Sequence, residues 1–92
     1  MEYRITMMLD GVGTADAEGL LADLQRIAPE NGPVLSTFTD RPHTTDVTVA
    51  LDAGDAAVAV VEAAQLLARA WGNRAATIVG IEAERVDEAW EG

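Results

Sequence analysis

Three short segments and the C-terminal tail hold the residue types that could bind a ligand or move a proton. The first is the turn from Asp10 to Thr14, where Gly11-Val12-Gly13 precedes a predicted helix and backbone amides could cradle an anion. The third glycine of a dinucleotide-binding motif is missing, and Asp16 and Glu18 place negative charge at the same helix end. We interpret the segment as a tight turn. In the alternative interpretation, a ligand contacts Asp10, Gly11, Gly13 and Thr14.

His43 is the single histidine and lies in the turn Asp40-Arg41-Pro42-His43. One imidazole without a second histidine or a cysteine makes a poor metal site, although Asp46 is close in sequence. The chain has no cysteine, which excludes disulfides, thiolate catalysis and cysteine-bound zinc. We therefore expect no metal site and no cofactor.

Glu82 and Glu84 lie on one face of the last predicted strand. Paired carboxylates act as acid and base only inside a pocket that shifts their pKa values. Near the end of so small a domain, they are typical of a solvated edge that resists pairing with another strand. We expect no catalytic residue and no enzymatic activity.

Trp90 lies in the charged tail Asp87-Glu88-Ala89-Trp90-Glu91. Two interpretations are open for this residue. The indole either folds back over the domain or anchors a partner protein, as exposed tryptophans often do.

Composition narrows the classes of partner. Sixteen acidic residues against six arginines and no lysine give a formal net charge of −10. A polyanion repels phosphate, so we expect no direct contact with nucleic acid or with a membrane. No apolar run approaches the ~20 residues of a membrane span, and no signal peptide is recognisable. We expect a cytoplasmic protein.

Strand and helix periodicities alternate along these 92 residues. Period-two alternation predicts strands at Glu2–Leu9, Val34–Thr39, Thr44–Leu51 and Ala75–Val86. Imperfect alternation around Gly80 indicates a bulge in the last strand. The predicted sheet thus contains four strands.

Two helices are predicted between these strands. Thr14 is the expected N-cap of the first, and Asp52 or Asp55 that of the second, which ends near Trp71. The apolar stripe of the first helix is Leu20, Leu21, Leu24, Ile27 and Ala28. That of the second is Ala57, Val60, Val61, Ala64, Leu67, Ala68 and Trp71.

This order of elements predicts an α+β, ferredoxin-like βαββαβ two-layer sandwich: a four-stranded antiparallel sheet with two helices on one face. We expect residues 1–86 to form a single domain and residues 87–92 to form an acidic tail. The core face of the sheet is predicted to carry Tyr3, Ile5, Met7, Leu9, Val47, Val49 and Leu51. The open face is predicted to carry Glu2, Arg4, Thr6, Met8, Leu35, Thr37, Thr39, Asp46, Thr48 and Ala50. Because this face has no aromatic residue, it differs from the RNA-binding sheets of such sandwiches.

Four segments, Tyr3–Asp10, Gly19–Leu24, Thr45–Asp52 and Ile78–Glu84, resemble a group of small actinobacterial domains that often precede a helix-turn-helix segment. This resemblance implies a dimerising or sensing module, free-standing or used by a phage to engage a host protein. Residues 1–92 contain no helix-turn-helix segment, so we expect that DNA binding does not carry over. The Asp10-Gly-Val-Gly turn is also similar to that of ACT-type regulatory domains, although their Asp-x-Pro-Gly turn is absent.

We expect a non-enzymatic protein-interaction and dimerisation module, an accessory regulatory or phage-encoded protein, which docks a protein partner and forms a homodimer through its sheet face or an edge strand. The interacting residues are predicted to be Met8, Leu35, Thr37, Thr48 and Trp90. The alternative is an ACT-like, small-molecule-sensing regulatory domain that uses the turn from Asp10 to Thr14.

Overall fold

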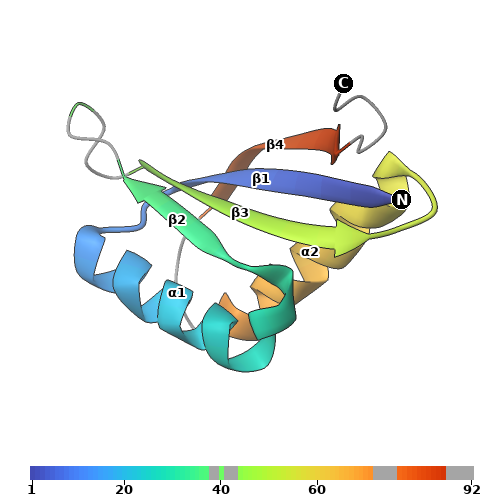
Figure 1. The fold of residues 1–92 in the computed structure, drawn as a ribbon. Helices are drawn as coiled ribbons and strands as arrows, with labels where there is room; N and C mark the ends of the chain where they lie inside the picture. The colour runs from blue at the N-terminus through green and yellow to red at the C-terminus, as the bar shows by residue number, and fades with distance from the viewer. Residues whose placement is uncertain (38–39, 41–43, 72–76, 87–92) are drawn as a thin grey trace, which may run out of the picture.

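The computed structural model describes residues 1–37, 40, 44–71 and 77–86, apart from the side chains of Thr14 and Ala15. Figure 1 shows the elements in chain order. They are β1 (Glu2–Asp10), α1 (Thr14–Ile27), the 3-10 turn η1 (Pro29–Asn31), β2 (Val34–Thr37), β3 (Thr44–Asp52), α2 (Ala56–Trp71) and β4 (Thr77–Val86).

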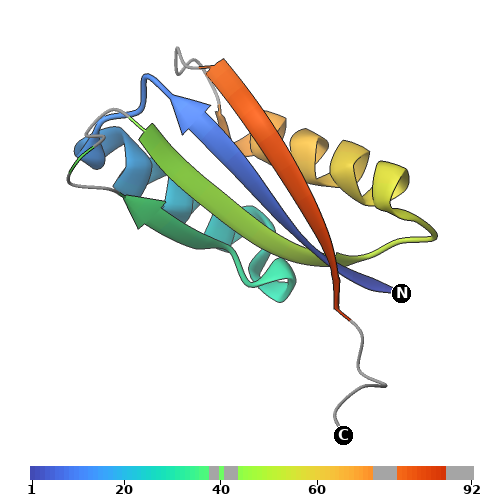
Figure 2. The same ribbon diagram turned by 90° about the horizontal axis from the view of Figure 1, so that it is seen from above.

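The four strands form one antiparallel sheet in the order β2-β3-β1-β4. The central strands β1 and β3 pair along their whole length, from Glu2 opposite Asp52 to Asp10 opposite Thr44. Both helices pack against the same side of the sheet, and no described element covers the other side (Figures 1 and 2). The predicted α+β architecture, a four-stranded antiparallel sheet with two helices, is confirmed.

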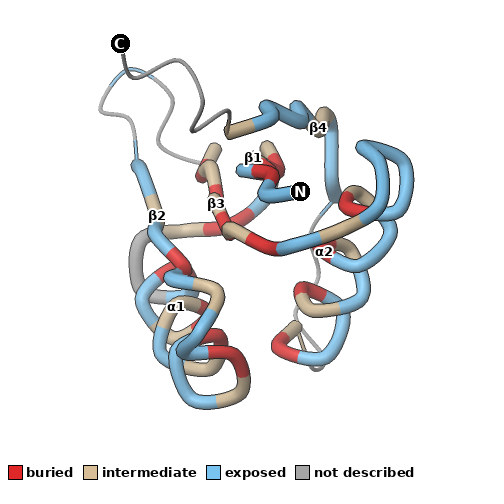
Figure 3. The backbone as a smooth tube through the Cα atoms, turned by 45° about the vertical axis from the view of Figure 1, so that its right-hand side comes forward, coloured by how far each residue is buried: buried red, intermediate tan, exposed pale blue. Residues whose placement is uncertain are grey.

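The core lies between the sheet and the helices. Tyr3, Ile5, Met7 and Leu9 of β1 are at most 7% exposed, whereas the residues between them are exposed or half-buried. On β3 the alternation continues with Thr45, Val47, Val49 and Leu51. Figure 3 shows these buried positions alternating along the two central strands. All seven sheet residues predicted for the core are confirmed, because strict alternation leaves a strand only one way to bury its apolar set.

Helix α1 begins one residue away from the predicted cap. Gly13 is the N-cap and Thr14 is the first helical residue, so the prediction of Thr14 as the N-cap is wrong. The Gly13 carbonyl accepts a hydrogen bond from the Ala17 amide at 2.9 Å, which closes the first turn without a capping side chain. Leu20 and Leu24 of the predicted stripe are fully buried, and Ile27 packs at its border.

Helix α2 buries a different stripe from the predicted one. Its buried residues are Ala59, Ala63, Leu67 and Ala70. Val61 is 54% exposed, and Ala57 and Ala68 are exposed as well, so only part of the predicted stripe faces the core. The helix is apolar almost all round, and its hydrophobic periodicity therefore says little about which side faces inward. Small alanines on the inner side let the helix approach the sheet closely.

Asp55 caps this helix: its Oδ1 accepts a hydrogen bond from the Val58 amide at 2.9 Å.

The register of β2 reverses the predicted faces of that strand. Leu35 is opposite Val47, and Thr37 is opposite Thr45, so both lie on the helix-covered side. The prediction that they belong to the open face is wrong. Alternation alone does not decide whether Val34 or Leu35 faces the core, because both residues are apolar. In the structure the larger Leu35 packs against the core, and Val34 is 57% exposed. Phe38 and Thr39 lie outside the described residues.

The bulge predicted near Gly80 is present in β4. Met8 is opposite Gly80 and Leu9 is opposite Ile78, which leaves Val79 without a partner residue on β1. Neither described helix is long and apolar enough to cross a membrane.

Candidate docking surface

A small uncharged patch occupies the centre of the open face. Thr6 of β1 lies opposite Thr48 of β3, and Met8 and Ala50 are the next residues on this face of β1 and β3; all four are half-buried. Met8 itself lies opposite Asp46, and Ala50 lies opposite Arg4. The hydroxyl groups of Thr6 and Thr48 are hydrogen-bonded to one another, with their Oγ1 atoms 3.1 Å apart. We call these four residues the central patch. A cross-strand hydroxyl pair and a methionine can lose water to a partner without leaving a charge unpaired.

The Met8 side chain lies over Gly80 on the neighbouring strand. A Cβ atom built at Gly80 would stand 2.6 Å from the Met8 Cε atom, closer than van der Waals contact allows. The missing side chain therefore makes the space in which Met8 rests. The sequence indicated only the bulge at this position. The contact depends on the register that places Gly80 opposite Met8.

Carboxylates border the central patch at both ends of the sheet and along β4. We call this group the acidic rim, and it consists of Glu2, Asp10, Asp46, Asp52, Glu82 and Glu84. Arg4 Nη1 lies 3.1 Å from Glu84 Oε1, and the amino terminus lies 3.3 Å from Asp52 Oδ1. All four partners are substantially exposed, so these pairs add little stability and leave the face strongly negative.

The structure separates the residues predicted to interact. Met8 and Thr48 belong to the central patch and lie on the two central strands, β1 and β3. Leu35 and Thr37 lie on the covered side of the sheet. Trp90 and His43 are outside the described residues. Val34 was missed: it lies opposite Thr48 and extends the open face towards β2.

The turn from Asp10 to Thr14 has the geometry of a tight turn. Gly11 adopts a φ of 88°, in the left-handed region that glycine tolerates best. Val12 is only 2% exposed and belongs to the core cluster. None of the grooves described below includes residues of this turn. A ligand role for Asp10, Gly11, Gly13 and Thr14 stays a prediction.

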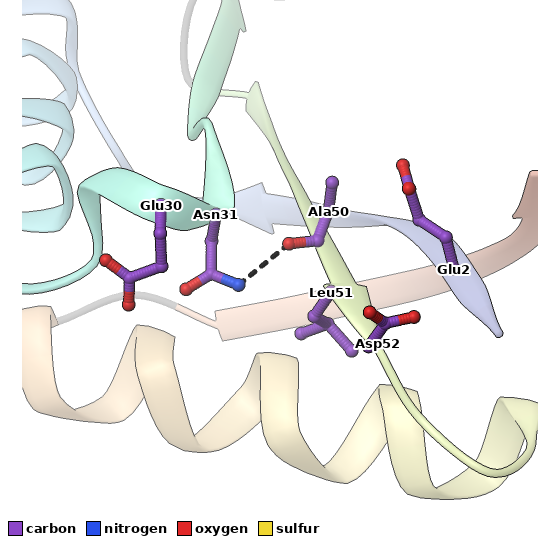
Figure 4. Close-up of a pocket in the computed structure, with 6 residues that line it drawn as sticks. All are labelled: Glu2, Glu30, Asn31, Ala50, Leu51 and Asp52. Carbon is purple, nitrogen blue, oxygen red and sulfur yellow. Dashed lines mark hydrogen bonds between the residues drawn. The ribbon is translucent and has the colours of Figure 1, made fainter.

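A shallow groove of about 320 Å³ lies where η1 approaches the end of β3 (Figure 4). It is lined by Glu2, Glu30, Asn31, Ala50, Leu51 and Asp52. The Asn31 side-chain amide donates to the Ala50 carbonyl at 2.8 Å, so its role is to fasten η1 to β3. A second groove, of about 360 Å³, continues from Glu30 to Arg69 on α2.

Within the described part of the chain, no three histidines or acids are grouped closely enough to hold a metal ion.

Comparison with known proteins adds no relative. No family model matches the chain, and no curated protein matches it. The resemblance to small actinobacterial domains therefore stays a prediction.

Proposed function

We propose that the chain is a ferredoxin-like interaction module without enzymatic activity. The class is supported by the chain order of the elements, by a sheet with β1 and β3 at its centre, and by two helices on one side. The described residues form shallow grooves and no metal-ligating cluster, and an interaction role requires neither a deep pocket nor a metal.

The observation that supports docking is the central patch with its acidic rim. Protein interfaces commonly have an uncharged, well-packed centre and a polar rim that excludes water. The rim here has a single sign of charge apart from Arg4 and the amino terminus, so its complement is a positively charged surface. The proposed partner is a basic protein that rests on Thr6, Met8, Thr48 and Ala50.

Charge also separates a basic protein from a second copy as the occupant of this face. Two copies joined face to face would bring one acidic rim against another, and each chain carries a net charge of −10. Like charges brought together in this way cost several kcal/mol. Self-association through the open face is therefore disfavoured.

The test is affinity capture from the source organism with matched charge variants. The wild-type chain is expected to retain a basic protein at about 0.05 M salt and to release it at about 0.5 M, because salt screens charged contacts. Thr48→Arg places a positive charge in the central patch and is expected to abolish retention of that protein. Gln25→Arg makes the same charge change on the exposed side of α1 and should leave retention intact.

Equal retention by the wild type, Thr48→Arg and Gln25→Arg would contradict docking on the open face. Trp90→Ala tests the tail separately. Loss of the same captured protein in Trp90→Ala would identify this tryptophan as a further anchor.

A further inference from the structure

The two helices differ on the side that faces away from the sheet. Exposed positions of α1 include Asp16, Glu18, Gln25 and Arg26, which are charged or polar. The corresponding side of α2 is almost uncharged over about three turns. We call it the α2 strip, and its residues, all exposed, are Ala57, Val58, Val61, Gln65 and Ala68.

An exposed helix normally presents polar residues to water, and one that is apolar all round is normally covered. Val58 and Val61 are 43% and 54% exposed. Together with Ala57, Glu62 and Gln65 they line a shallow hollow on the helix. We propose that a second copy of this chain covers the α2 strip from Val61 to Ala68, with the two α2 helices packed antiparallel about a two-fold axis.

The charges beside the strip support a second copy as the occupant. Glu62 and Arg69 are exposed, are separated by two helical turns and lie on the same flank of the strip. Neither makes an ion pair or hydrogen bond with another residue in the described ranges. About a two-fold axis midway between Gln65 and Leu66, Glu62 of each copy lies level with Arg69 of the other. Two symmetric ion pairs then border the contact.

The same register brings small side chains together at the centre. Val61 of one copy lies within about 3 Å, along the helix axis, of the position of Ala68 in the other. The Gln65 side chains face one another across the axis, where each amide can donate to the carbonyl oxygen of the other. Val58 lies beyond the end of the opposite helix and contributes little.

This contact is small. A helix of 16 residues is about 24 Å long, and a single pair of such helices forms an interface at the weak end of the range. We expect a dissociation constant in the range of about 10 to 100 μM. The strip lies on the side of α2 opposite its buried residues, and the helices cover the side of the sheet that faces away from the open face (Figure 1). The open face of each copy therefore stays accessible in the dimer.

The test is sedimentation equilibrium of the full chain between about 10 μM and 1 mM at about 0.15 M salt, where the net charge is screened beyond about 8 Å. The wild type is expected to dimerise. Glu62→Arg alone and Arg69→Glu alone each place like charges together and should weaken the dimer by about tenfold or more. The double variant Glu62→Arg/Arg69→Glu should restore it.

Val61→Asp and Val58→Asp together test the register of the two helices. In the proposed dimer the first variant places a charge inside the contact, and the second places the same charge outside it. Only Val61→Asp should dissociate the dimer, and circular dichroism confirms that each variant is folded. A wild type that is monomeric at about 1 mM would overturn the proposal. The proposal would also be overturned if Glu62→Arg and Arg69→Glu alone left the dimer as stable as in the wild type, or if the double variant did not restore it. These results concern self-association only, so they are distinct from the capture experiment on the open face.

Discussion

Met7 and Met8 are neighbours on β1, and their surroundings show how the two sides of the sheet differ. Met7 is fully buried against the helices, whereas Met8 lies half-buried over Gly80 on the open face. The covered side is continuous and apolar, with Thr45 as its buried polar residue. The open side has a central patch of two threonines, a methionine and an alanine within an acidic rim. One strand thus supplies the stability of the domain on one side and a surface for recognition on the other.

The largest expected effect comes from the covered side. Ile5→Ala removes a fully buried side chain from the central strand and should lower the free energy of unfolding by about 2 to 5 kcal/mol. Thr6→Ala, one residue further along the same strand, loses the hydrogen bond to Thr48 and should cost about 1 kcal/mol. Urea denaturation of both variants measures the difference. Equal losses would mean that the two faces are equally buried in solution.

A smaller effect is expected at the start of α2, the helix that completes the covered layer. Asp55→Ala removes the acceptor of the Val58 amide and should lower the free energy of unfolding by about 1 kcal/mol. Asp52→Ala is the matched control, since the exposed Asp52 pairs with the amino terminus and caps no described helix. Thermal unfolding should show a lower midpoint for Asp55→Ala than for Asp52→Ala. A lower midpoint for Asp52→Ala would show that Asp55 is not the residue that caps α2.

Gly80→Ala tests the contact that shapes the central patch. The added methyl group meets the mobile end of the Met8 side chain, which can move aside, so the free energy of unfolding should change by less than about 1 kcal/mol. The Met8 methyl resonance should shift in a ¹³C spectrum while the Met7 resonance stays in place. An unchanged Met8 signal would show that the two residues do not touch.

The smallest effect on stability is expected at the acidic rim. Glu82→Lys changes an exposed side chain opposite Thr6 and should alter the free energy of unfolding by no more than about 0.5 kcal/mol. Its effect on association should be larger, because reversing a rim charge slows the encounter with a basic partner. Glu18→Lys on α1 makes the same change away from the open face. Surface plasmon resonance with the captured protein should show slower association for Glu82→Lys only.

The sequence predicted the parts of the fold in which one pattern dominates. The alternation from Tyr3 to Leu9 predicts the buried side of β1 without ambiguity, because every second residue is apolar and the others are mostly polar. The same reasoning failed for α2, since valine and alanine occur on all its sides. It also failed for β2, where only the pairing of Leu35 with Val47 decides which side of the strand is covered.

The candidate surface was predictable only in part. Thr6, Met8, Thr48 and Ala50 were assigned to the open face from alternation alone. The acidic rim was not, because Glu82 and Glu84 join Glu2 and Asp52 only once β4 is known to lie beside β1. The α2 strip was not predictable for the same kind of reason. Helical periodicity predicts Ala57, Val61 and Ala68 on the core side, whereas the packing of the helix buries Ala59 and Ala63.

The most direct test of the docking proposal uses the three methionines as internal probes. The chain is labelled with ¹³C-methyl methionine and titrated with the protein that it captures. We predict that the Met8 resonance shifts or broadens on binding, while that of Met7, on the covered side of the same strand, keeps its position. A partner that binds and leaves Met8 unperturbed would contradict this prediction.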